Sequence, residues 1–137
     1  MERVMHQIGE VAEAVGLSLR TIRHYEEVGL VPPSGRTAGG FRLYTDDDVE
    51  RLRVVKQMKP LDFTLEEMRD LLQVREWLAG DVAVDERESL VGRLAMYAAA
   101  AQARCETLRS QVESAEAITA SLRREVSRSR RASGSRP

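Results

Sequence analysis

The sequence is poor in aromatic residues and in cysteine. Phenylalanine, tryptophan and tyrosine make up 4% of its 137 residues, whereas 31% are charged. This composition favours a helical protein with modest cores over a β-sandwich or barrel. Cys105 is the only cysteine, which excludes a disulfide within the chain and is typical of a protein from a reducing cytoplasm.

The chain also lacks long hydrophobic runs and the motifs of enzymes. No run of about 18 apolar residues is present, and residues 1–6 do not begin a signal peptide. We therefore expect neither membrane insertion nor secretion, and we expect a cytoplasmic location. The sequence contains no nucleophile–base pair, no phosphate-binding glycine loop followed by lysine and no metal-ligand spacing. We expect no enzyme, no cofactor and no metal site.

The net charge of −1 hides an uneven distribution of charge. Residues 1–76 carry 11 basic and 14 acidic side chains, whereas residues 123–137 carry six arginines and one glutamate. Within the acidic part, residues 28–45 contain two arginines and no acid. Nucleic-acid binding depends on a local positive surface rather than on the total charge. The charge count alone therefore decides neither for nor against a nucleic-acid partner.

The first 30 residues predict two short helices. Apolar residues recur at the spacing of one helix face over residues 8–16, and Gly16 suits the left-handed conformation that ends a helix. Ser18 is a candidate N-cap for a second helix that runs to about residue 28. Two such helices indicate a helix-turn-helix, and a two-helix fragment with a solvated charged face is the alternative. The second helix would present to solvent Arg20, Arg23 and His24.

Residues 30–44 predict a small β-hairpin. Two prolines stop the preceding helix, and a pair of glycines marks a turn between two very short strands. Arg36 and Arg42 would project from this hairpin as a wing, and the hydroxyl of Tyr44 would reach a phosphate. A plain surface loop is the alternative. In either structure the alternation along a strand would turn Phe41 toward the core.

Two capping boxes predict a third and a fourth helix. Thr45 pairs with Asp48 at the start of the third, and Thr64 pairs with Glu67 at the start of the fourth. Pro60 would separate them. Three consecutive acidic residues open the third helix, where they suit the positive end of the helix dipole better than they suit a metal ion.

A long helix is predicted from about residue 85 to residue 126. Helix-forming residues dominate there, and apolar residues recur at intervals of seven. A helix of roughly 60 Å cannot bury such a stripe on so small a neighbour, so we predict a homodimer. A helix folded back on its own domain, or split at Gly92, is the alternative. The predicted dimerisation residues are Leu90, Leu94, Tyr97, Ala101, Leu108, Val112, Ala115, Ile118 and Leu122.

Together these elements predict an all-α fold with a small β-hairpin wing. A winged helix-turn-helix would occupy residues 1–76, and a linker and dimerisation helix would occupy residues 77–126. Residues 127–137 are rich in serine and arginine, and we predict that they are disordered. Trp77 stands at the junction of the first two segments. It could line a small apolar ligand pocket, although a structural anchor is the preferred interpretation.

In four segments the chain resembles the MerR family of bacterial transcription regulators. The segments are residues 8–12 (IGEVA), 19–30 (LRTIRHYEEVGL), 40–44 (GFRLY) and 63–68 (FTLEEM). The resemblance implies a dimer, held by an antiparallel coiled coil, that binds a pseudo-palindromic site in double-stranded promoter DNA. Such dimers bend and untwist the DNA, so that RNA polymerase engages both promoter elements.

The resemblance also implies which residues contact DNA. It places Arg20, Thr21, Arg23 and Tyr25 of the second helix at the major groove and its phosphates. It assigns the flanking backbone to Arg42 and Tyr44 of the wing, and a further phosphate to Lys59. With the exposed His24 and Arg36, the predicted DNA-binding set is Arg20, Thr21, Arg23, His24, Tyr25, Arg36, Arg42, Tyr44 and Lys59.

The chain departs from the family at the effector. Metal-sensing members carry cysteine ligands near the end of the dimerisation helix, whereas this chain has only Cys105, at mid-helix. Drug-sensing members append a ligand-binding domain, for which the sequence after the helix is too short. The small-molecule effector is therefore unknown. The alternative function is a protein-interaction regulator, for example of a sigma factor, that acts through the coiled coil with weak or lost DNA binding.

Overall fold

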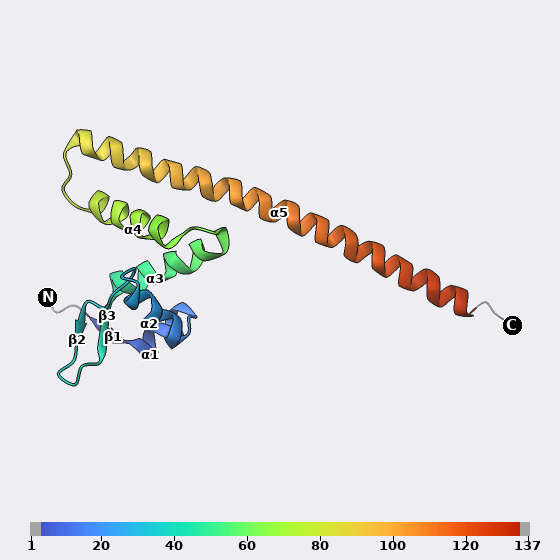
Figure 1. Ribbon diagram of the computed structural model, residues 1–137, viewed down its shortest axis with the longest axis horizontal. Coiled ribbons are helices and arrows are strands. Elements are labelled where there is room, and N and C mark those ends of the chain that lie inside the picture. The colour runs from blue at the N-terminus through green and yellow to red at the C-terminus, as the bar shows by residue number, and fades with distance from the viewer. Residues whose placement is uncertain (1–3, 135–137) are drawn as a thin grey trace. The chain divides into compact units, whose positions relative to one another are not determined.

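The computed structural model describes residues 4–134 (Figure 1). The chain divides into two compact units, residues 1–97 and residues 98–137. In chain order the elements are β1 (Met5–Gln7), α1 (Ile8–Val15), α2 (Leu19–Glu27), β2 (Gly35–Arg36), β3 (Arg42–Thr45), α3 (Asp46–Met58), a 3₁₀ turn (Lys59–Leu61), α4 (Leu65–Ala79) and α5 (Val84–Gly134). The predicted fold class, helical with a small antiparallel sheet, is confirmed.

The helices of the first unit begin at the predicted caps. The Ser18 side chain accepts a hydrogen bond of 3.0 Å from the backbone N–H of Thr21 at the start of α2. Capping boxes open α3 at Thr45 and α4 at Thr64. Between α1 and α2, Gly16 takes a φ of 74°, which a side chain would make costly. These local signals set where α1 ends and where α2, α3 and α4 begin.

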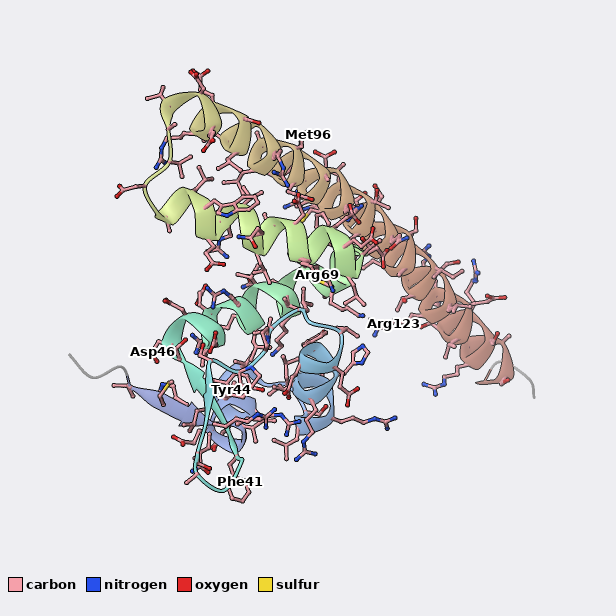
Figure 2. All side chains as sticks on the ribbon, turned by 60° about the vertical axis from the view of Figure 1, so that its left-hand side comes forward. Phe41, Tyr44, Asp46, Arg69, Met96 and Arg123 are labelled. Atoms are coloured by element: carbon pink, nitrogen blue, oxygen red, sulfur yellow. The ribbon has the colours of Figure 1, made fainter. Side chains whose placement is uncertain are left out.

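The sheet has three strands in the order β1-β3-β2, all antiparallel. The wing hairpin, residues 35–45, was expected, but β1 was not, because a strand of three residues has no readable alternation. The prediction that Phe41 points toward the core is wrong, since its side chain is 69% exposed. Phe41 precedes β3 and lies at the tip of the wing, where Figure 2 shows it pointing away from the body of the unit.

The core of the first unit lies where the helices α1 to α4 meet the inner face of the sheet. Ile22 of α2 and Leu52 of α3 are fully buried there, as is Met68 of α4. Burying each such side chain contributes roughly 1.5–3 kcal/mol to folding. The core therefore fixes α2 and leaves its opposite face in solvent.

The start of α5 packs against α4 within the first unit. Leu90 is buried, and Asp70 of α4 accepts a hydrogen bond of 2.6 Å from the hydroxyl of Tyr97 and pairs with Arg93. The ring of Tyr97 also lies edge-on to Phe63, with centroids 6.2 Å apart. The first compact unit thus extends to Tyr97, beyond the boundary at residue 76 that the sequence indicated.

These contacts bear on two of the predicted dimerisation residues. Leu90 is buried inside its own chain, and the half-buried Tyr97 bonds Asp70 with its hydroxyl, so the first turns of α5 pack on their own domain. The place of both residues in a seam with a second copy stays a prediction. Gly92 does not split the helix.

In the second unit α5 continues as one helix to Gly134. The predicted disorder is therefore wrong for residues 127–134, and residues 135–137 lie outside the described range. Arginine and alanine are good helix formers, and the sequence has no proline between Pro60 and Pro137 to stop the helix. Among the residues that the structure describes, no helix has the length and apolar character that crossing a bilayer requires.

Candidate nucleic-acid interface

The solvent-facing side of α2 carries a basic surface. Ile22 and Tyr25 point into the core, which leaves Arg20, Arg23 and His24 exposed on the other side. A hollow of about 760 Å³ lies on this side, and Lys59, at the start of the 3₁₀ turn after α3, contributes to its lining. Its lining brings together six of the predicted residues, Arg20, Thr21, Arg23, His24, Tyr25 and Lys59, with Glu27 as the one acid.

Tyr25 is the least accessible member of this set. Its side chain is 4% exposed, so only an edge of it reaches the hollow, and burial raises the pKa of its hydroxyl. The ring of His24 lies beside it, with centroids 6.0 Å apart. The ring of Tyr25 therefore anchors α2 in the core, and its contact with a phosphate stays a prediction.

The two wing arginines are bound to Glu26 of α2. Arg36 lies 2.5 Å from one carboxylate oxygen of Glu26, and Arg42 pairs with the other oxygen. Arg36 also donates to the carbonyl oxygen of Gly40 at 3.0 Å. The hydrogen bond to Glu26 raises the pKa of Arg42, and the carboxylate itself is only 18% exposed. Wing and helix are thus joined by one charged cluster, which we call the Glu26 clamp.

The sequence analysis missed the Glu26 clamp, although α2 contains a signal for it. Glu26 falls on the same side of the helix as the buried Ile22, where an unpaired carboxylate is costly. An acid on the apolar face of a helix needs a cationic partner from elsewhere in the chain. The hairpin with its two arginines supplies that partner.

Tyr44 does not lie at the surface as predicted. Its side chain is fully buried, because β3 is the central strand and Tyr44 faces the helices (Figure 2). Burial raises the pKa of its hydroxyl. Among the described residues, that hydroxyl has no hydrogen-bond partner. The prediction that Tyr44 contacts a phosphate is therefore corrected. Tyr44 lies in the core beneath the wing.

We expect the substitution Tyr44→Phe to leave the free energy of unfolding unchanged or to raise it slightly, because it removes a hydroxyl that forms no hydrogen bond. Tyr97→Phe is the matched comparison, since the Tyr97 hydroxyl donates to Asp70 and its loss should cost about 1 kcal/mol. Urea unfolding of both variants measures the difference. An equal loss in the two would show that the Tyr44 hydroxyl has a partner.

The same Asp70 hydrogen bond gives Tyr97 a pH dependence. Burial and the bond to Asp70 raise the pKa of Tyr97 to about 12 from 10.0. The folded state therefore favours the neutral phenol more than the unfolded chain does. This contribution to stability is present below pH 10.0 and is lost as the pH rises toward 12.

Two of the three acids that open α3 make contacts within the first unit. Asp48 is buried, accepts hydrogen bonds from the backbone of Thr45 and the hydroxyl of Ser34, and pairs with Arg51. Asp46 lies 2.7 Å from the ring of His6. Over residues 4–134, no group of three histidine, cysteine or acidic side chains is placed to hold a metal ion.

The remaining predicted dimerisation residues lie along α5. Leu94 is half-buried in the first unit, as is Ala101 in the second. The others are exposed in the single chain and form a continuous apolar stripe, which we call the α5 stripe: Leu108, Val112, Ala115, Ile118 and Leu122.

Comparisons with a family model and with curated proteins both match the first half of the chain to MerR-type helix-turn-helix regulators. The family described as "MerR HTH family regulatory protein" matches residues 7–74. The HTH-type transcriptional regulator ZntR of Escherichia coli K12 is 42% identical over 71 residues, which are 52% of this chain and 50% of that protein. The mercuric resistance operon regulatory protein of Bacillus cereus is 46% identical over 68 residues, 50% of this chain and 52% of that protein. The chain spans about half the length of these curated relatives.

Solved structures extend the likeness beyond the helix-turn-helix. The N-terminal part of the multidrug transporter activator of Bacillus subtilis, MtaN, is 30% identical with a TM-score of 0.52, over 88% of this chain and 97% of that one. HiNmlR, a MerR family regulator lacking the sensor domain and bound to promoter DNA, is 22% identical with a TM-score of 0.57. That match covers 96% of this chain and 95% of the other, and at this identity it shows the fold alone.

Proposed function

Because the chain belongs to the MerR family of helix-turn-helix regulatory proteins, we propose that it is a sequence-specific, DNA-binding transcription regulator that acts in the cytoplasm. The observation that carries the proposal is the hollow along α2. It gathers Arg20, Arg23 and Lys59 around one solvent-facing helix surface, with Glu27 as the only acid in its lining. A positive surface on the second helix of a helix-turn-helix fits the major groove of DNA.

The roles of the residues follow from their places on α2. Arg23 and His24 are exposed on the face opposite the core, where they can reach base edges. Arg20, at the first turn of α2, and Lys59, after α3, also line the hollow and suit phosphates. Thr21 bonds the capping Ser18 at 2.8 Å and therefore acts as a positioning residue.

The wing extends this surface through the Glu26 clamp. Arg36 and Arg42 hold the hairpin to α2, so helix and wing meet the DNA as one preformed unit. A phosphate that approaches the wing competes with Glu26 for the same guanidinium groups. We therefore propose that the wing arginines orient the wing first and contact the flanking backbone second.

We propose that the active form is a homodimer joined through the α5 stripe in an antiparallel coiled coil. Two identical helix-turn-helix domains require a pseudo-palindromic site, with half-sites spaced by whole helical turns of the DNA. Control of transcription would then come from bending and untwisting the promoter, with RNA polymerase affected through the DNA. In this proposal the protein has no catalytic role, and the two helix-turn-helix domains act by binding DNA alone.

The structure removes the reason for the alternative function. A protein-interaction regulator with lost DNA binding was suggested by the acidic balance of residues 1–76. Several of those acids make contacts that stabilise the fold. Asp48 and Glu67 belong to helix capping boxes, and Glu26 and Asp70 pair with arginines. They do not line the hollow along α2.

The test is selection of genomic fragments by the purified protein, followed by footprinting at a fixed salt concentration. We expect enrichment of fragments that carry a protected pseudo-palindrome between widely spaced promoter elements, with sites of enhanced cleavage where the DNA is bent. Binding at equal strength to random fragments at that salt would contradict sequence-specific recognition.

A further inference from the structure

A second cavity lies in the first unit, away from the hollow along α2, where a loop joins α4 to α5. Its volume is about 500 Å³, within the range of pockets that hold small molecules. Its lining comes from the last turn of α4, the loop that follows it and the first two turns of α5. Figure 1 shows the loop that joins α4 to α5. The lining residues are Glu76, Trp77, Gly80, Asp81, Val82, Glu86, Ser89 and Leu90.

The lining combines an aromatic surface with negative charge. The indole of Trp77 is 47% exposed, and Val82 and Leu90 add apolar surface. Three carboxylates, those of Glu76, Asp81 and Glu86, belong to the lining, and no basic residue does. The cavity therefore offers an aromatic face and an excess of negative charge within the same small volume.

The carboxylates are largely available to a ligand. Glu76 has one ion-pair contact, a distant one of 3.8 Å to Arg51. Asp81 and Glu86 are exposed, and neither forms an ion pair with any residue of the described chain. The neighbouring Arg87 instead points to the carbonyl oxygens of Leu78 and Gly80, at 3.4 Å from each.

The spacing of the carboxylates distinguishes between two kinds of cation. Nowhere in residues 4–134 are three acidic, histidine or cysteine side chains close enough to ligate one metal ion, and this includes the three acids of the cavity. Carboxylates that are not grouped as ligands of one ion can still surround a larger cation whose charge is spread over an apolar body. An exposed indole adds to that preference, because a cation is attracted to the face of its ring.

We propose that this cavity is a binding site for a small organic cation with an apolar body, such as a substituted quaternary ammonium. Trp77 contacts the cation with its ring face, Asp81 and Glu86 supply the opposing charge, and Val82 and Leu90 contact the apolar part. The site lies outside the proposed DNA-binding surface, so its ligand binding can be measured in the absence of DNA. The result is independent of the proposed function.

The experiment uses the full chain and three probes of similar size. Benzyltrimethylammonium is the cation, benzyl alcohol the neutral compound and benzenesulfonate the anion. Binding is followed by isothermal calorimetry and by fluorescence, because Trp77 is the only tryptophan in the sequence. We expect saturable binding of the cation, with binding of the neutral probe weaker by about tenfold and no binding of the anion.

Variants then assign the binding to the cavity. The double substitution Asp81→Asn with Glu86→Gln should weaken the cation by about tenfold or more, and Trp77→Leu should do the same by calorimetry. Trp77→Phe keeps a ring face and should retain most of the affinity. Glu113→Gln with Glu116→Gln is the matched control, since it removes two exposed acids from α5 in the second unit and should leave binding unchanged.

Three results would overturn the proposal. The first is absence of cation binding at millimolar ligand by folded protein. The second is equal affinity for the neutral probe. The third is cation binding that survives the Asp81 and Glu86 substitutions, or that falls equally in the control. A thermal melt of each variant establishes that it is folded, so a loss of binding is not a loss of structure.

Discussion

The double variant Leu108→Glu with Leu122→Glu is expected to be monomeric and to lose about 100-fold or more in affinity for the operator. The two leucines are 40% and 53% exposed in the single chain and belong to the α5 stripe. In the proposed dimer each substitution would place a carboxylate in an apolar seam on both chains. Charges buried without partners are strongly unfavourable there. The monomer would then have one helix-turn-helix domain, and the gain in affinity from binding both half-sites at once would be lost.

Sedimentation analysis of the variant measures the oligomeric state, and a titration of labelled operator measures the affinity. Ser110→Glu with Ala117→Glu is the matched control, because it adds the same charge on the opposite side of α5, at exposed positions. The control should remain a dimer with unchanged operator affinity. A stable dimer of the leucine variant would show that the copies associate through another surface.

The second large effect is expected at Arg23. We expect Arg23→Ala to weaken specific binding by about 1–3 kcal/mol at each half-site, if its guanidinium group reads a base in the major groove. In a dimer with two half-sites the total loss would be roughly twice that amount. Affinity for random DNA at the same salt should fall far less, because the contact that Arg23→Ala removes is to a base and not to a phosphate. The ratio of specific to non-specific affinity is thus the informative quantity.

Competition titrations with operator and random duplexes, at one salt concentration, provide that ratio. Arg75→Ala is the matched control, since Arg75 is an exposed arginine on α4 outside the hollow along α2. It should change neither affinity. If Arg23→Ala reduced specific and random binding by the same factor, Arg23 would contact a phosphate and the base-reading role would pass to another residue of α2.

The local signals of the sequence were sufficient to predict the helices. Ser18, Thr45 and Thr64 cap α2, α3 and α4 as expected, because a cap is formed by residues three positions apart. The resemblance to the MerR family likewise identified the residues that meet in the hollow along α2. Six of them are brought together there by the packing of α2 and by the turn after α3.

Features set by distant contacts could not be predicted in the same way. β1 exists because Met5 to Gln7 pair with the end of β3, 36 residues or more away along the chain. Asp70 fixes the start of α5 through Arg93 and Tyr97, and no periodicity distinguishes that contact from a contact with a second copy. Strand alternation predicted the wrong side for Phe41, because the residue that β3 buries is Tyr44, which lies an odd number of positions away and therefore faces the other side.

The Glu26 clamp also changes how the ionic strength dependence of operator binding should be interpreted. The salt slope of a protein–DNA complex counts the small cations that leave the phosphates as basic side chains replace them. Arg36 and Arg42 already share a carboxylate, so their transfer to phosphates would leave Glu26 to be hydrated or to recruit a cation of its own. Their net release of ions is therefore smaller than two arginines suggest. The measured slope would report chiefly Arg20 and Lys59, and would underestimate how many guanidinium groups lie near the DNA.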